Sequence, residues 1–165
     1  MRVLGIDPGS RVTGWGVIEA NGRKTVHVDN GGIAPKQGLP FAKKLKFIYE
    51  GILDLIEQYK PDVAAIEDVF VAKNVRSSLI LGHARGTAMV AVSSADIEIL
   101  EYTPTEVKKA IVGTGRASKE QIQKMVQVLL SLPESAFEDA SDALAVAICH
   151  LNSSKLNMRI KDAIK

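Results

Sequence analysis

Cysteine is nearly absent from this sequence, with Cys149 the single one in 165 residues. One thiol cannot form an internal disulfide, which indicates a reducing compartment or a thiol packed in the core. Long hydrophobic runs are absent as well. The apolar run at the N-terminus ends at Asp7, too short for the core of a signal peptide, and no later run approaches a membrane span. We therefore expect a cytoplasmic protein.

Several catalytic signatures are also missing. The sequence contains no HExxH, no GxSxG and no GxxxxGK[ST], which argues against a zinc protease, a serine hydrolase and a P-loop enzyme. Its three histidines are scattered and are more simply explained as surface or core residues. The formal net charge of +2 does not itself indicate nucleic acid. Basic residues do cluster within 43–46 and 108–124, but such clusters are equally compatible with a solvated surface.

The pattern of apolar residues predicts an α/β protein with a mixed sheet of five strands flanked by helices. Two short alternating segments and the Asn21-Gly22 turn predict an antiparallel meander in the first third of the chain. A helix then separates two buried strands, which indicates a parallel crossover. The expected strands are 3–6, 13–18, 24–29, 63–66 and 97–100. The expected helices cover 41–60, 74–92, 103–112, 118–132 and 138–151.

No linker, repeat or low-complexity segment divides the chain. We therefore expect one domain over residues 1–152, followed by a frayed C-terminal tail over 153–165, which is rich in Asn, Ser and Lys.

Four acids occupy positions that these elements bring together. Asp7 and Glu67 end two strands that are expected to be parallel, at the edge where open α/β sheets place their sites. Asp139 and Asp142 lie three residues apart at the start of a helix, so they share one face. A cluster of carboxylates repels itself unless cations neutralise it, and oxygen ligands suit Mg²⁺ or Mn²⁺. Paired cations are the usual means of phosphodiester cleavage.

Each acid also has a purely structural explanation. Asp139, with Glu138, could simply favour the positive end of a helix, and Asp7 could form the turn before Pro8. Glu67 could pair with a lysine. Any one acid is therefore weak support for a metal site, and the prediction depends on all four occurring together on this order of elements.

The sequence resembles the RuvC-type Holliday-junction resolvases over approximately residues 2–152. The stretches that carry the resemblance occur in family order: GIDPGSRVTGWGVI, AIEDVFVAKN, LGHARG, VKKAIVGTGRASKEQI and DASDALAVAICH. The resemblance implies a ribonuclease-H-like fold, a homodimer and Mg²⁺-dependent paired nicking of four-way DNA junctions. It makes Asp7, Glu67, Asp139 and Asp142 the ligands of two Mg²⁺ ions, for which Mn²⁺ could substitute. Some relatives have histidine in place of Asp139.

The resemblance also implies DNA contacts. Lys108 and Lys119 match lysines near the scissile phosphate, where they would be catalytic. Phe70 matches an aromatic at the junction centre, and an aromatic among basic residues can stack on an unpaired base. The basic or polar residues that follow it are Lys73, Asn74 and Arg76. The alternative is a loop phenylalanine packed into the domain.

The expected assembly is a symmetric dimer built on the helix at 74–92, where Gly82 and Gly86 would permit a close backbone approach. A branch-migration helicase complex is a further partner implied by the resemblance. Three other classes remain as alternatives. They are a sugar-kinase or actin-like ATPase, for which the chain is short, a catalytically silent DNA-binding module, and a ribonuclease-H-like nuclease acting on RNA–DNA hybrids.

Overall fold

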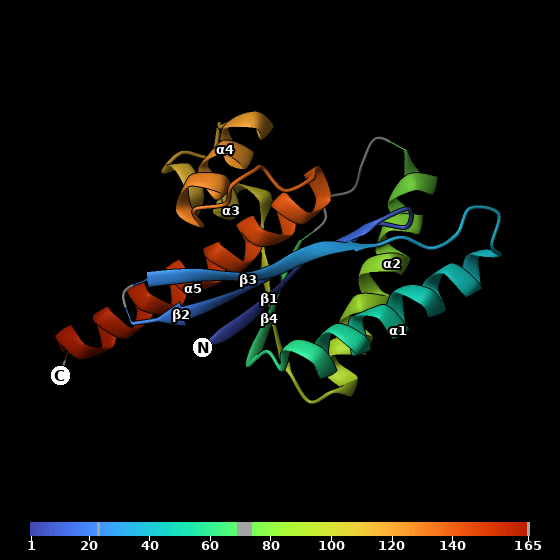
Figure 1. Ribbon diagram of the computed structural model, residues 1–165, viewed down its shortest axis with the longest axis horizontal. Helices are drawn as coiled ribbons and strands as arrows, with labels where there is room; N and C mark the ends of the chain where they lie inside the picture. The colour runs from blue at the N-terminus through green and yellow to red at the C-terminus, as the bar shows by residue number, and fades with distance from the viewer. Residues whose placement is uncertain (23, 69–73, 165) are drawn as a thin grey trace.

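The computed structural model describes residues 1–22, 24–68 and 74–164, and a single five-stranded sheet organises them (Figure 1). The order across the sheet is β3-β2-β1-β4-β5, with β1 at the centre. The expected mixed sheet is therefore confirmed. In chain order the strands are β1 (Arg2–Asp7), β2 (Thr13–Asn21), β3 (Lys24–Ile33), β4 (Val63–Glu67) and β5 (Glu98–Tyr102).

The pairing of the strands follows the predicted directions. β1, β2 and β3 form an antiparallel meander, whereas β4 pairs parallel with β1 and with β5. The helix between β1–β3 and β4 supplies the crossover that a parallel pair requires. As a consequence β1 and β4 end at the same edge of the sheet, which brings Asp7 and Glu67 to that edge.

Helices cover both faces of the sheet. α1 (Phe41–Tyr59) and α2 (Val75–Ser94) pack against each other and bury one face through the core that contains Leu4, Ile6 and Ile66. α5 (Glu138–Ile164) packs along β1 and β2 on the other face. α3 (Pro104–Val112) and α4 (Lys119–Leu129) lie beside the first part of α5 (Figure 1). No helix in the described ranges is long and apolar enough to span a bilayer.

Local sequence explains where α3 and α4 begin. Thr103 accepts a hydrogen bond from the backbone N–H of Glu106, whose side chain accepts from the Thr103 N–H in return, and Pro104 occupies the first helical position. Ser118 and Gln121 form the same reciprocal arrangement ahead of α4. These caps set where the helices that carry Lys108 and Lys119 begin.

The end of the last helix differs from the expectation. We expected the helix to stop near Leu151, but α5 continues to Ile164. Residues 152–164 contain neither glycine nor proline, so nothing in that stretch breaks the intrahelical hydrogen bonds. A composition rich in Asn, Ser and Lys was therefore a poor indicator of where the helix ends.

Candidate active site

Asp7 and Glu67 lie side by side on the face of the sheet that α5 covers. In the parallel register Gly5 is opposite Ala65 and Ile6 is opposite Ile66. Ile6 and Ile66 point into the core beneath α1 and α2. Because side chains alternate along a strand, the next residues, Asp7 and Glu67, point to the opposite face.

Glycines in the first two strands bring the start of α5 against this edge. A Cβ atom on Gly14 of β2 would lie 2.0 Å from the backbone oxygen of Asp139, and one on Gly5 of β1 would lie 2.0 Å from the backbone oxygen of Ala143. Any side chain at these two positions would force the helix away. The missing side chains are therefore what places Asp139 and Asp142 next to Asp7.

The four acids form one electrostatic cluster. Burial, and after it the nearby charges of Asp142, Glu67 and Asp139, together raise the pKa of Asp7 to about 8, against the opposing charge of Lys119. Burial also raises the pKa of Glu67 and of Asp142, each partly offset by Lys119. The structure thus brings together the four acids that the sequence singled out.

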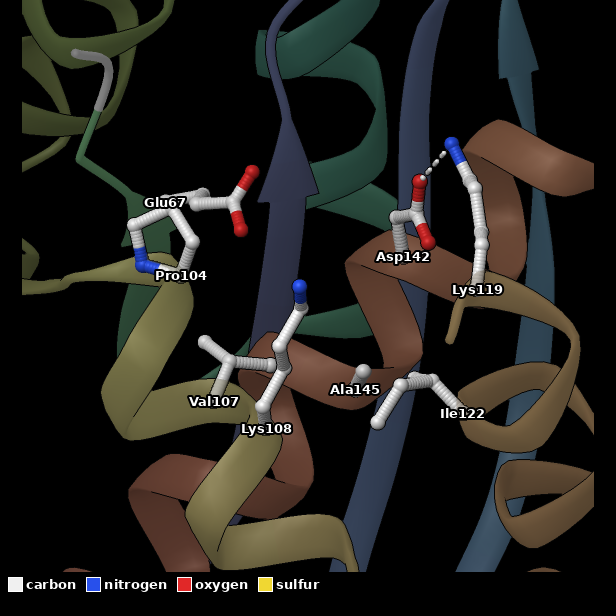
Figure 2. Close-up of a pocket in the computed structure, with 8 residues that line it drawn as sticks. All are labelled: Glu67, Pro104, Val107, Lys108, Lys119, Ile122, Asp142 and Ala145. Carbon is white, nitrogen blue, oxygen red and sulfur yellow. Dashed lines mark ion pairs between the residues drawn. The ribbon is translucent and has the colours of Figure 1, made fainter. Parts of the chain in front are cut away.

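Two lysines, Lys108 and Lys119, line a pocket of about 230 Å³ together with Glu67 and Asp142 (Figure 2). Lys119 Nζ lies 2.9 Å from Asp142 Oδ2 and 2.5 Å from Glu138 Oε1. Burial lowers the pKa of Lys119, but the hydrogen bonds to Glu138 and Asp142 raise it above its usual value overall. In Figure 2 the Lys108 ammonium points into the space between Glu67 and Asp142. Glu67 and Asp142 thus lie on opposite sides of the pocket, with Lys119 on the side of Asp142 and the Lys108 ammonium between them.

The donor set of this pocket suits a hard divalent cation, although the side chains are not closed around one. Within the described ranges, no three His, Cys, Asp or Glu side chains form a group that could hold a metal ion. Lys119 stands against Asp142 where a cation would otherwise balance its charge. Carboxylate oxygens are the ligands that Mg²⁺ and Mn²⁺ prefer.

The predicted DNA contacts are only partly visible. Phe70 and Lys73 lie outside the described residues. Asn74 caps α2, since its side-chain oxygen accepts hydrogen bonds from the backbone N–H groups of Arg76 and Ser77. Arg76 is exposed in the first turn of that helix. A role for Asn74 in starting α2 is therefore added to its predicted role at DNA.

Sequence reasoning missed three residues that shape this site: Gly14, Arg85 and Glu138. Glu138 was considered only as an acid at the positive end of a helix, yet it binds Lys119. Arg85 of α2 donates to the backbone oxygen of Glu67. Gly14 lies in one of the stretches that carry the resemblance, but its role in letting α5 approach the sheet depends on its contact with Asp139, which is distant in sequence. The alternation of Gly14 and Gly16 in a buried strand was a signal that could have been used.

A sheet in this strand order, with carboxylates at adjacent strand ends and at the start of a packed helix, defines a ribonuclease-H-like nuclease. Solved structures similar to this chain include a yeast mitochondrial Holliday junction resolvase, with a TM-score of 0.67 at 14% identity, covering 91% of this chain and 77% of that chain. At this identity the similarity concerns the fold alone. Residues 3–150 match the family described as crossover junction endodeoxyribonuclease RuvC. The chain belongs to this family.

Relatives of the same name are similar over nearly the whole chain. The protein from Geobacter sulfurreducens is 58% identical over 154 residues, covering 93% of this chain and 94% of its own length. The one from Trichlorobacter lovleyi is 52% identical over 164 residues, with coverages of 99% and 92%. Among solved structures, Thermus thermophilus RuvC in complex with Holliday junction substrate has a TM-score of 0.90 at 29% identity, covering 95% of this chain and 96% of that one.

Proposed function

We propose that this chain resolves four-way DNA junctions by paired symmetric nicks, with Asp7, Glu67, Asp139 and Asp142 as the metal-binding acids of a nuclease domain spanning residues 1–152. The observation that carries the proposal is geometric: Asp7 and Glu67 end adjacent parallel strands, and the start of α5, which bears Asp139 and Asp142, packs against the same edge of the sheet. Membership of the crossover junction endodeoxyribonuclease family supports the choice of substrate.

Two Mg²⁺ ions would be held by these acids, and Mn²⁺ could replace them. When bound, paired cations would supply activation of a water molecule and stabilisation of the leaving oxygen. The chain's own part is to present carboxylate oxygens from a rigid strand edge and a rigid helix. Asp142 must exchange its contact with Lys119 to become a ligand. Glu138, which also contacts Lys119, would still hold its ammonium at the edge of the pocket.

Lys108 and Lys119 would contact the DNA backbone at the cut. Lys108 projects from α3, and Lys119 projects from the first turn of α4. Lys119 lies on the side of the pocket opposite Glu67 (Figure 2). An ammonium beside the scissile phosphate offsets the negative charge that grows during cleavage. Phe70, Lys73, Asn74 and Arg76 would contact the junction beyond the pocket, with Phe70 stacking on an unpaired base.

The raised pKa of Asp7 predicts how metal binding depends on pH. At pH 7 Asp7 of the metal-free protein is largely protonated because its pKa is about 8, so binding a cation must release that proton. We expect Mn²⁺ affinity to rise between pH 7 and pH 9. Calorimetry in buffers of different ionisation enthalpy should detect the released proton, and Asp7→Asn should abolish that release. An affinity independent of pH over this range would contradict the assignment.

The proposed unit is a two-fold dimer formed through α2. An apolar groove of about 590 Å³ runs between α1 and α2, and its floor includes Leu79, Gly82, Gly86 and Val90. Leu79 and Val90 are 58% and 57% exposed. Beyond the adjacent residues and turns of α2 itself, no atom of the described residues lies within 4 Å of a Cβ built on Gly82 or Gly86, so the close approach expected at these glycines is not made by another described element. A second copy of α2 would cover this surface, and a C₂ axis would match two sites to the two strands that are cut.

Gly86→Glu is expected to give a folded monomer that has lost paired cleavage. The Cβ of the new side chain has open space beyond its own helical turn, so the fold should survive, but the carboxylate would place a charge in the apolar groove. Sedimentation equilibrium at tens of micromolar, with nicking scored on each strand, measures both effects. Val128→Glu is the matched control because Val128 is an exposed apolar residue of α4. A strict monomer of the unmodified protein that makes both cuts in one binding event would contradict the dimer.

A comparison of substrates tests the function itself. The protein is incubated with a mobile four-way junction, a linear duplex of the same sequence, and an RNA–DNA hybrid, each with Mg²⁺ or with EDTA. We expect symmetric nicks in two junction strands of like polarity, with Mg²⁺ only, and little cutting of the other substrates. Cleavage of the hybrid at a rate equal to that of the junction would favour the ribonuclease alternative.

A further inference from the structure

Arg85 connects α2 to the end of the strand that carries Glu67. Its Nε donates to the backbone oxygen of Glu67 at 3.2 Å. Its Nη2 lies 3.5 Å from Asp68 Oδ1 and forms a second ion pair with Glu101 of β5. The Arg85 side chain is 17% exposed, whereas those of Asp68 and Glu101 are close to half exposed. One guanidinium therefore joins a helix to two strand ends.

These contacts hold a single peptide unit at both of its polar ends. The backbone oxygen of Glu67 and the backbone N–H of Asp68 belong to the same peptide group. Arg85 donates to the oxygen, and the N–H donates to the backbone oxygen of Tyr102 at 2.8 Å. A planar peptide fixed at both ends cannot rotate without breaking one of these bonds. The backbone angle that follows the Glu67 Cα is thereby set, and with it the direction of the Glu67 side chain.

The position of Glu67 makes this restraint necessary. Glu67 is the last residue of β4; it still pairs with Tyr102 of β5, but the ladder with β1 ends one residue earlier, at Ile66. A strand end with few ladder bonds is the part of a sheet that moves most easily. The Glu67 carboxylate also faces Asp142. The pKa of Glu67 is raised mainly by burial and next by the charge of Asp142. Like charges push the side chain outward unless the backbone is held.

We propose that Arg85 is a positioning residue for Glu67, acting from the face of the sheet opposite the acid cluster. The proposal rests on the role assigned to Glu67 as a metal ligand. Outer contacts that orient a ligand typically change metal affinity or activity by about 10-fold to 100-fold when they are removed. Because Arg85 lies on α2 between Gly82 and Gly86, the helix that would form the dimer is also the helix that fixes a catalytic acid.

Arginine is required here for its shape as well as its charge. The guanidinium presents N–H groups in different directions, which lets one side chain reach a carbonyl oxygen and two carboxylates. Arg85→Lys keeps the charge but offers one compact ammonium, so it should retain the ion pairs better than the bond to Glu67. Arg85→Gln removes the charge and the fork together.

The test compares Arg85→Gln and Arg85→Lys with Glu101→Gln as the matched control, since that change removes one ion pair and leaves the bond to Glu67. Measured quantities are Mn²⁺ affinity without DNA, junction Kd without metal, single-turnover cleavage at saturating protein, and the melting temperature. We expect Arg85→Gln to weaken Mn²⁺ binding about 10-fold and slow cleavage about 10-fold to 100-fold. Arg85→Lys should lie between Arg85→Gln and the unmodified protein, and junction Kd should change by less than about 2-fold.

Other results would overturn the proposal. Unchanged Mn²⁺ affinity and cleavage in both Arg85 variants would do so, as would losses no greater than those of Glu101→Gln. If the loss of cleavage merely follows the unfolded fraction, Arg85 contributes to stability and not to the position of Glu67. If Arg85→Gln does not fold, metal affinity and cleavage are measured on Arg85→Lys instead. Glu67→Gln separates the two levels of argument. If it cuts at the unmodified rate, the ligand assignment fails and the role of Arg85 fails with it, whereas an inactive Glu67→Gln beside unaffected Arg85 variants overturns only the latter.

Discussion

Asp7→Asn is expected to reduce junction cleavage by at least about a thousandfold while junction binding survives. Asp7 interacts electrostatically with each of the other three acids, so its replacement removes the carboxylate that all of them neighbour. Binding depends on junction shape and phosphate contacts, which do not require the acids. Single-turnover nicking and a gel-shift Kd measured on the same junction separate the two effects. Glu67→Gln and Asp142→Asn should behave alike, and Asp139→Asn should be similar or somewhat milder.

Stability distinguishes this loss from a folding defect. The pKa of Asp7 is raised from 3.8 to about 8, so the native state binds a proton that the unfolded chain has released over this range. The contribution of Asp7 to stability therefore falls as pH rises from about 4 to about 8. An uncharged Asn avoids that loss, so Asp7→Asn should melt at a higher temperature than the unmodified protein at pH 9 in EDTA. Strong cleavage by the variant would contradict the metal-site assignment.

Local patterns were sufficient to predict the sheet and the acids. The meander, the crossover and the placement of Asp7 and Glu67 at one edge each follow from apolar periodicity and strand direction. The capped starts of α3 and α4 follow from Thr103-Pro104 and Ser118, which act over a few residues. Such features are encoded by neighbours in sequence, so periodicity and capping rules apply to them directly.

Contacts between distant segments could not be predicted in the same way. Arg85 reaches Glu67 across 18 positions, and Lys119 reaches Glu138 and Asp142 from a separate helix. Composition and spacing in the sequence do not distinguish a basic residue that binds an acid in the fold from one that is solvated. The helix beyond Leu151 was missed for a different reason, because polar composition was given more weight than the absence of glycine and proline.

Gly14 shows how much of the site depends on such a contact. Two acids of the cluster come from α5, and that helix packs on β1 and β2 with backbone against backbone. Its distance from the sheet is set by the absence of side chains at Gly5 and Gly14. The sequence presents Gly14 and Gly16 only as glycines in a strand, where they weaken the strand unless another group approaches closely. The acids are therefore positioned by residues that carry no chemistry of their own.

Gly14→Ala is expected to slow cleavage about 100-fold, because a misplacement of about 1 Å at a catalytic site can cost that much. The added Cβ would lie 2.0 Å from the Asp139 backbone oxygen, so the first turn of α5 must move and carry Asp139 and Asp142 away from Asp7. Overpacking of this kind costs roughly 1–3 kcal/mol, so the protein should still fold. Gly16→Ala is the matched control on the same strand and face, and it first meets Leu144 side-chain carbons at 2.5 and 2.6 Å. That contact should lower the melting temperature with little effect on single-turnover cleavage, since Leu144 lies beyond the acids. Equal loss of cleavage in the two variants at equal folded fraction would show that the rate depends on general packing and not on the contact between Gly14 and Asp139.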